Sequence, residues 1–304
     1  MDLSVVIPTH DRPDLLRRTL GSLRAAKPCG LAWEVLVVLN STPPRLRRAY
    51  EDVLREGPAG VRGVDEPVQG KCRALNTGIR AARGHAVAFL DDDVIAHDGY
   101  LVGIEEALRE DGYRIFGGRV LPVWTAPPPR WAIGDAPLTT SRGPIVAHDH
   151  GDTPRPYVPG MYRPVGCNFF CHRALFDQHG YFDLRLGPGS GKGHMGGEES
   201  QLLRRFQERG ERILYVPRVA VDHPVDPARV TKRYFRYRMF CSGRSAPYLT
   251  TRTYVTLFDV PRHLYVKALT ALGRSLAATL RGRSVEAFER QLDLCRYVGA
   301  AYEY

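Results

Sequence analysis

The sequence of 304 residues contains no long apolar run, no cysteine framework and no recognisable leader. No apolar stretch approaches the roughly 18 to 20 residues that cross a bilayer. The first residues, MDLSVVIPTHDR, lack the basic segment and the apolar core of a secretory signal, so we expect a cytoplasmic protein. The six cysteines are scattered without the spacing of a disulfide scaffold or a zinc finger, and we expect reduced thiols.

Two phosphate-binding motifs are also absent. A dinucleotide fold needs GxGxxG after its first strand, and here that turn reads PTHDRP. The stretch GPGSGKGH at 187–194 lacks the first glycine of a P-loop, because Leu186 stands there, and Gly193 follows Lys192 in place of Ser or Thr. We interpret this stretch as a flexible loop that approaches a ligand.

Acidic residues are nearly absent from 229–283, which holds twelve Lys or Arg and one acid, Asp259. The formal net charge of +10 therefore belongs to this segment. Aromatic residues interleave with the basic ones, a pattern found both in nucleic-acid-binding segments and on anionic membranes. It is equally typical of helices that pack on the rest of the chain with solvated arginines. Among the functional interpretations we favour an anionic membrane surface, and we expect no nucleic acid.

The first half of the chain alternates between strand and helix patterns. Short apolar runs bounded by turn residues predict strands, at 3–8, 33–39, 61–64 and 85–90. Helical spacing of apolar residues predicts helices between them, at 13–26, 43–56 and 71–84. Repeated strand–helix units imply an α/β fold with a parallel sheet flanked by helices.

The second half is less regular. Residues 121–165 are rich in Pro, Gly and aromatic residues, and we expect long ordered loops there. Regularity returns further on: the patterns predict a strand entering a helix at 165–180, an amphipathic helix at 198–210, and short strands at 212–217 and 219–223. From residue 228 the pattern predicts helices to the end.

Polar residues follow three of the predicted strands, at 8–12, 40–42 and 91–93. In parallel sheets, ligands bind beyond the carboxyl ends of the strands. The run Asp91-Asp92-Asp93 is the most informative, because adjacent carboxylates repel each other unless water or a cation screens them. A solvated loop also explains the run, and so does a helix N-terminus, although Asp98 lies closer to the next helix.

Later residues supply partners for these carboxylates. A hard divalent cation, Mg²⁺ or Mn²⁺, prefers oxygen ligands and tolerates an imidazole, so Asp93 and His223 can hold one while a diphosphate completes its shell. Glu199 or Glu198, at the start of an amphipathic helix, can take a proton from an attacking hydroxyl. Together these residues describe group transfer from a nucleoside diphosphate carrier.

Taken together and in their order along the chain, the motifs resemble those of the bacterial inverting glycosyltransferases of family 2. The resemblance rests on VVIPTHDR, on KCRALNTGIRAARGHAVAFLDDD, and on GGEESQLLRRFQERG followed by YVPRVAVDH, and it covers roughly residues 3–225. It implies the GT-A fold, a mostly parallel central sheet flanked by helices. The expected catalytic domain, 1–225, comprises a Rossmann-like half that binds the nucleotide sugar (1–120) and an acceptor half (121–225). A basic, mostly helical C-terminal region, 226–304, follows it.

The resemblance also implies roles for individual residues. Asp91 and Asp93 match the DxD pair, in which Asp91 faces the ribose and the metal and Asp93 holds the metal, and His223 matches a late metal-binding histidine. Glu198-Glu199 stands where the family has a Glu-Asp pair, so Glu199 is the expected base with Glu198 beside it. The implied nucleotide-sugar-binding residues are Pro8, Thr9, Arg12, Asn40, Lys71, Arg73, Asn76, Asp91 and Asp92. The residues implied around the sugar and the acceptor are Gly166, Cys167, Asn168 and Gly197.

Two positions depart from the family pattern. Leu39 stands where the family usually has an acid against the base, with Asn40 as a substitute, which weakens the preference for uridine. Glu199 replaces the usual Asp, which lengthens the base by one methylene. We expect a metal-dependent, inverting transferase that uses a nucleotide sugar, first of all a UDP-sugar, and a carbohydrate, lipid-linked or small-molecule acceptor. A nucleotidyltransferase and a non-catalytic carbohydrate- or nucleotide-binding relative are the alternatives.

Overall fold

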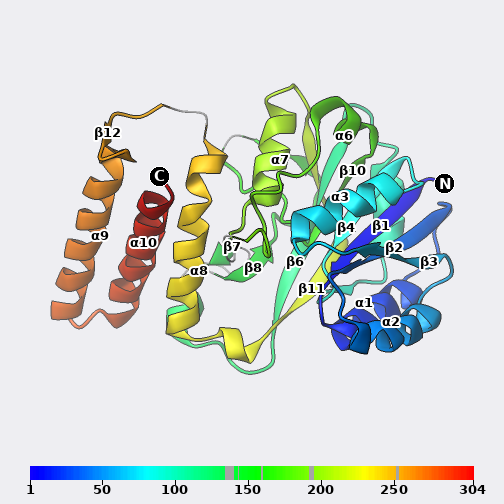
Figure 1. The fold of residues 1–304 in the computed structure, drawn as a ribbon, viewed down its shortest axis with the longest axis horizontal. Coiled ribbons are helices and arrows are strands. Elements are labelled where there is room, and N and C mark those ends of the chain that lie inside the picture. Colours follow the sequence, from blue (N-terminus) through cyan, green and yellow to red (C-terminus); the bar gives the residue numbers. More distant parts are fainter. Residues whose placement is uncertain (134–139, 143, 159, 192–194, 251–252) are drawn as a thin grey trace.

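The computed structural model describes residues 1–133, 140–142, 144–158, 160–191, 195–250 and 253–304. A twisted central sheet runs through the larger part of the molecule, and three C-terminal helices stand at one side of it (Figure 1). Within the described residues, no helix combines the length and the apolar character needed to cross a membrane.

The sheet has the strand order β3-β2-β1-β4-β10-β6-β11-β5. Its members are β1 (Leu3–Thr9), β2 (Trp33–Asn40), β3 (Val61–Glu66), β4 (Ala86–Leu90), β5 (Ile95–Ala96), β6 (Ile115–Trp124), β10 (Asn168–His172) and β11 (Ile213–Val225). The first four strands pair in parallel, β6 pairs in parallel with β11, and β10 runs antiparallel between β4 and β6. The predicted strands of the first half are therefore present, in a mostly parallel sheet.

Helices cover both faces of the sheet because the strands alternate their apolar side chains. Val5 and Ile7 of β1 belong to the core beneath one set of helices, whereas Val6 belongs to the core beneath the other. The first set is α1 (Pro13–Ala25), α2 (Pro44–Glu56) and α4 (Tyr100–Ala107). The second set is α3 (Lys71–Ala81), α6 (Ala174–His179) and α7 (Glu198–Gln207).

The C-terminal helices join the body through a third apolar cluster. They are α8 (Lys232–Arg244), α9 (Arg262–Leu280) and α10 (Ser284–Glu303), and α10 lies between the other two (Figure 1). Trp131, in α5 (Arg130–Ile133), packs edge-on against Phe235 of α8 and Phe288 of α10. These aromatic contacts attach the C-terminal helices to the part of the molecule that contains the sheet.

The structure corrects three expectations. Part of 121–165 is not loop, because β7 (Thr140–Arg142), β8 (Ile145–His148) and β9 (Arg155–Pro156) pair at the margin of the sheet. The two short strands predicted between 212 and 223 form one strand, β11, whose register shifts between Val216 and Ala220. The chain after 228 is not wholly helical, since β12 (Thr256–Leu257) and β13 (Val260–Pro261) form a small hairpin.

We predict that the crossing of α8 and α10 depends on two glycines. A Cβ at Gly299 would lie inside van der Waals contact of the Phe240 carbonyl oxygen, and one at Gly243 would meet the Arg296 carbonyl in the same way. Gly299→Ala must therefore push the helices apart, and it should lower the free energy of unfolding by about 1–3 kcal/mol in urea titrations.

Gly273 is the matched control, because it lies in α9, where a Cβ would meet no atom of the described residues within 4 Å. Gly273→Ala should leave stability unchanged or raise it by up to ~1 kcal/mol, since Ala favours an exposed helix interior. Equal stabilities for the two variants would contradict the close crossing.

Candidate active site

The candidate site lies where the strand order reverses. From β1 the chain builds β2 and β3 toward one edge of the sheet, then places β4 on the other side of β1. Such a switch leaves a crevice at the carboxyl ends of the two strands that flank it. Thr9 ends β1, Asp91 follows β4 at once, and Asn168 pairs with Leu90 because β10 starts at this edge. Residues far apart in the sequence meet here as a result.

The three adjacent aspartates have three different sets of partners. Asp91 Oδ1 lies 2.7 Å from Lys71 Nζ. Asp92 is fully buried, accepts a hydrogen bond from Thr9 Oγ1 at 2.6 Å and pairs with Arg12 at 2.6 Å. Asp93 Oδ2 pairs with Arg12 at 3.0 Å. Two cations thus offset the repulsion that three neighbouring carboxylates would otherwise feel.

The pKa values follow from burial and from these partners. Burial opposes ionisation of Asp91, but Lys71 outweighs it, so the pKa of Asp91 lies below its ordinary value. For Asp92 burial dominates over the attraction of Arg12 and raises its pKa to about 6. Burial also opposes the charge on Lys71, yet Asp91 and Glu198 hold the pKa of that ammonium above its usual value. The site therefore keeps Lys71 charged beside an ionised Asp91.

Asp93 and His223 leave room for a cation. Asp93 Oδ1 is buried and has no hydrogen-bond partner among the described residues, and His223 Nε2 lies 3.9 Å from it. This orphaned oxygen beside an imidazole fits a hard divalent cation. In the described part of the chain no three His, Cys, Asp or Glu side chains gather closely enough to hold an ion by themselves. Asp93 and His223 are therefore the two side chains that would hold a cation here.

Two glutamates face the aspartates from the start of α7. Glu198 is buried, with Oε1 3.8 Å from Lys71 Nζ. Glu199 keeps part of its surface open to solvent, but protein surrounds it on most sides. Burial, followed by the neighbouring Glu198, raises the pKa of Glu199 to about 8. Gly166 lies opposite, and a Cβ there would come within 3.4 Å of Glu199 Oε2, so the glycine keeps the approach to this carboxylate open.

The three predicted asparagines bind backbone groups. Asn40 donates to the Val68 carbonyl at 2.8 Å and accepts from the Gly70 N–H at 2.9 Å. Asn76 exchanges two hydrogen bonds of 3.0 Å with the backbone of Phe182. Asn168 donates to the carbonyls of Arg119 and Val219 at 2.8 and 2.9 Å. Their side-chain donors are thus committed to holding the loops and strands around the site.

The other predicted residues lie around this centre in different surroundings. Pro8 is half-buried in β1, Arg73 is exposed on the first turn of α3, and Gly197 has a left-handed φ of 85° where α7 begins. Cys167 is buried, and burial together with Asp91 raises the pKa of its thiol. Leu39, at the position of a family acid, is buried against the apolar core. The segment expected to be long loops, 121–165, and the loop expected to approach a ligand, 187–194, lie partly outside the described residues.

No motif in the sequence indicates two further features of the site. The hydroxyl of the buried Tyr50 accepts a hydrogen bond from the Arg12 N–H at 3.0 Å and lies 3.3 Å from Thr9 Oγ1. Asp11 and Ser41, just past the ends of β1 and β2, have left-handed φ values of 55° and 51°, which are uncommon outside glycine. In the sequence Tyr50 is merely one apolar position of a predicted helix.

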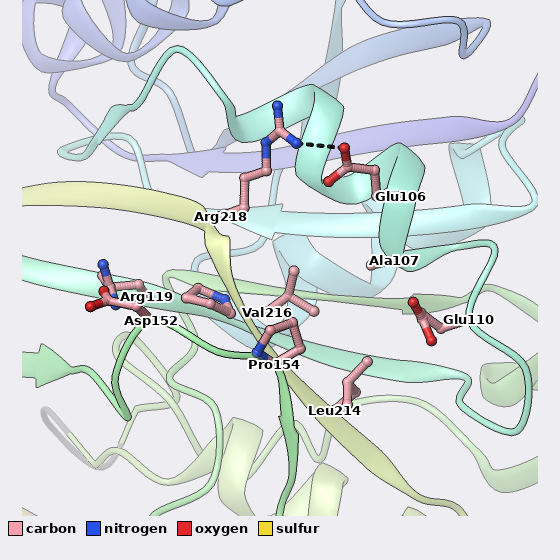
Figure 2. A pocket seen from close by; sticks show the side chains of 10 residues that line it. Glu106, Ala107, Glu110, Arg119, Asp152, Pro154, Leu214, Val216 and Arg218 are labelled. Atoms are coloured by element: carbon pink, nitrogen blue, oxygen red, sulfur yellow. Dashed lines mark hydrogen bonds and ion pairs between the residues drawn. The ribbon is translucent and has the colours of Figure 1, made fainter.

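A cavity of about 420 Å³ lies elsewhere, between α4, β6, β11 and the segment before β9. Figure 2 shows its lining, in which Arg218 reaches toward Glu106. Arg119, on β6, pairs with Asp152 at 2.6 Å. Both arginines are therefore already neutralised, and none of the crevice residues described above lines this cavity. The strand ends, where charged groups with perturbed pKa values converge, are therefore the candidate active site.

Comparisons with known proteins found a matching family and related sequences. The profile of Glycosyl transferase family 2 matches residues 4–176. The succinoglycan biosynthesis protein ExoM of Rhizobium meliloti is 27% identical over 248 residues, which are 81% of this chain and 74% of that protein. The glucosyl-dolichyl phosphate glucuronosyltransferase of Haloferax volcanii is 24% identical over 263 residues, which cover 81% of this chain and 76% of that protein.

A solved structure shares the whole fold. The mannosyltransferase PcManGT of Pyrobaculum calidifontis, in complex with GDP-Man and Mn²⁺, aligns with a TM-score of 0.60 at 14% identity, over 98% of this chain and 86% of that one. The predicted GT-A fold, with its mostly parallel sheet and C-terminal helical region, is confirmed.

We predict that Glu199 makes stability depend on pH. A carboxyl group whose pKa is raised by folding favours the folded state when protonated. Its contribution is fully present below the ordinary value of 4.5 and is lost as the pH rises through about 8. Glu199→Gln should remove this loss, so the variant should gain stability relative to the wild type as the pH rises from about 5 to about 9 in denaturant titrations.

Glu208→Gln, at the exposed residue that follows α7, is the control. Its stability difference from the wild type should not change with pH as that of Glu199→Gln does. A flat difference for Glu199→Gln across this range would show that the carboxylate is not held in the environment described here.

Proposed function

Because the chain belongs to glycosyl transferase family 2 and is a glycosyltransferase, we propose that it moves a sugar from a nucleoside diphosphate to an acceptor hydroxyl, with inversion and with a divalent cation. The observation that carries this proposal is the meeting of three groups at the β1–β4 crevice. They are the Asp93–His223 pair, the half-buried Lys71 ammonium and the high-pKa carboxylate of Glu199. Each group suits a different part of the transfer.

On the donor side, Asp93 and His223 would hold Mg²⁺ or Mn²⁺, with Asp91 close by. When bound, the cation offsets charge on the departing diphosphate. Lys71 adds a fixed positive charge in the same crevice, and Arg12 orients Asp93 through its ion pair. That PcManGT, which shares this fold, was solved with GDP-Man and Mn²⁺ supports a nucleotide sugar and a divalent cation here.

On the acceptor side, Glu199 would act as the base. The acceptor oxygen forms a bond to the anomeric carbon as the bond from that carbon to the diphosphate oxygen breaks and its electron pair leaves with the diphosphate. Glu199 takes the acceptor proton, a role for which a pKa near the working pH is favourable. Glu199 Oε2 lies across from Gly166, which has no side chain to hinder an acceptor. A single displacement of this kind inverts the anomeric carbon.

The nucleotide base is the least specified part of the donor. Leu39 is buried in the core, and the side chain of Asn40 is bound to the backbone of Val68 and Gly70. A UDP-sugar is the first donor to test, with GDP- and TDP-sugars beside it. The Haloferax volcanii relative is named for glucosyl-dolichyl phosphate, which supports a lipid-linked acceptor as one candidate beside carbohydrates and small molecules.

We predict that substitution of Asp93 abolishes nucleotide binding, whereas substitution of Glu199 slows sugar transfer and leaves binding intact. Thermal unfolding of the protein with a panel of nucleoside diphosphates should show a Mn²⁺-dependent rise for at least one of them, since a ligand of the folded state stabilises it. Asp93→Asn should abolish this rise. Glu199→Gln should keep the rise but lower the rate of sugar transfer about 10²- to 10⁴-fold, as expected for loss of a general base.

Asp98→Asn is the control, because Asp98 is exposed on the turn between β5 and α4. It should keep both the rise and the rate. A folded wild type that responds to no nucleoside diphosphate would refute the proposal and favour a binding protein without transferase chemistry. A Glu199→Gln variant with full transfer activity would remove Glu199 from the reaction.

A further inference from the structure

The outermost helix, α9, carries a row of exposed aliphatic side chains. The row consists of Val266, Leu269, Leu276 and Leu280, which are 64%, 68%, 58% and 89% exposed. Their spacing of three, seven and four residues places them along one face of the helix. A row of large exposed apolar side chains of this kind is typical of a surface that binds another protein or a membrane.

This row is not a misplaced part of the core. The opposite face of α9 is the buried one: Leu264, Ala271, Ser275 and Ala278 are each at most 7% exposed. That face packs against α10, where Ser275 Oγ donates a hydrogen bond to the Ala287 carbonyl at 3.1 Å. The helix therefore packs against α10 with one face and exposes a second apolar face to solvent.

The hairpin that leads into α9 extends the apolar surface. Its turn residues Phe258 and Asp259 have left-handed φ values of 50° and 62°. This turn presents Phe258 at 86% exposure, with Val255 and Leu257 beside it at 70% and 45%. The hairpin lies at one end of α9 in Figure 1. An aromatic ring held at the tip of a tight turn adds an apolar anchor to the aliphatic row.

Basic residues border the row on one side. Lys267 and Arg274 of α9, and Arg281 directly after it, are all exposed, and their spacing of seven residues aligns them along one side. Lys267 and Arg274 also line a groove of about 200 Å³ between α9 and α10, together with Arg290. Arg290 pairs with Asp293 through Nη1, but its buried Nε has no hydrogen-bond partner among the described residues. The groove thus gathers three cations against one acid at the edge of the apolar row.

We propose that α9 and the β12–β13 hairpin form a docking surface for an anionic lipid bilayer. The apolar row and Phe258 enter the interface, while Lys267, Arg274 and Arg281 contact lipid phosphates, and the groove at Arg290 receives one of them. An amphipathic helix with a basic flank binds anionic bilayers through this combination of apolar burial and charge attraction. Because α10 and α8 separate α9 from the sheet, docking leaves the crevice at the strand ends free (Figure 1).

Charge distinguishes this occupant from the others. The sequence of α9 contains no Asp or Glu, so a second copy docked through the same face would bring one basic row against another. A nucleic acid would contact the basic row but would leave the aliphatic row in water. An anionic bilayer buries the aliphatic row and pairs its phosphates with the basic row at the same time.

The test is sedimentation of the full chain with phosphatidylcholine vesicles, with and without about one-third phosphatidylserine. Binding should require phosphatidylserine and should weaken as salt screens the charges. The triple variant K267Q/R274Q/R281Q should bind about a hundredfold more weakly, since each basic residue near such a surface contributes about fivefold. L269E/L276E should lose binding at any salt concentration, because it places charge in the apolar row.

R45Q/R48Q is the matched control, with two exposed arginines changed on α2, and it should bind as the wild type does. Equal binding to neutral vesicles, or no binding to anionic ones, would overturn the proposal. So would a dimer in sedimentation velocity that L269E/L276E abolishes, since the row would then belong to a second copy. Because every substituted position is exposed, circular dichroism should show unchanged folding. The outcome does not depend on the transferase reaction.

Discussion

The structure depends on the neutralisation of three consecutive carboxylates at the end of a buried strand. Asp91, Asp92 and Asp93 follow β4 without a spacer, and two cations from other parts of the chain, Lys71 and Arg12, meet them at 2.6 to 3.0 Å. Removing one partner of a buried ion pair leaves an uncompensated charge, which is far more costly than losing the pair as a whole. The positions of α3 and of the turn after β1 are therefore constrained by charge as well as by packing.

Uncharged groups keep those cations in place. Tyr50 holds the backbone of Arg12, and Asn40 holds the N–H of Gly70 just before Lys71. Buried amides that are fully hydrogen-bonded define one loop conformation, because every alternative conformation would leave a buried polar group without a partner. The crevice is thus built by polar side chains that need not touch a substrate, while Asp93, His223 and Glu199 remain available to one.

The sequence predicted the first four strands of the sheet well, and the strands after them less completely. Alternating runs such as Val5-Val6-Ile7 determine which face each side chain occupies, so β1 to β4 follow from local pattern alone. The strands within 121–165 could not be found this way, because β9 is only two residues long and exists through its pairing with β11, which lies far along the chain at 213–225. The bulge in β11 around Pro217 likewise made one strand look like two.

In the candidate site, too, some features follow from local sequence and others depend on contacts between distant parts of the chain. Residue types at strand ends indicated where charge would collect, and the family resemblance supplied roles for Glu199 and Asp93. Neither could show that the donors of Asn40, Asn76 and Asn168 are all bound to backbone groups, because those partners lie up to 106 residues away. Hydrogen bonds over such separations are consequences of the fold and leave no periodic trace in the sequence.

The charges of the molecule serve two different purposes, according to their surroundings. Near the crevice Lys71 and Arg12 each have an acid within 3.0 Å, so they contribute to local geometry and little to the net charge of the chain. The helix α9 contains no acid of its own to offset Lys267, Arg274 and Arg281, and its positive charge is exposed beside an apolar row. A field of that kind acts at a distance set by the screening length of the solvent, so in the proposed docking it would orient the whole molecule toward an anionic surface. Paired charge at the sheet and surplus charge on the outer helix thus place the proposed chemistry and the proposed docking on different parts of the molecule.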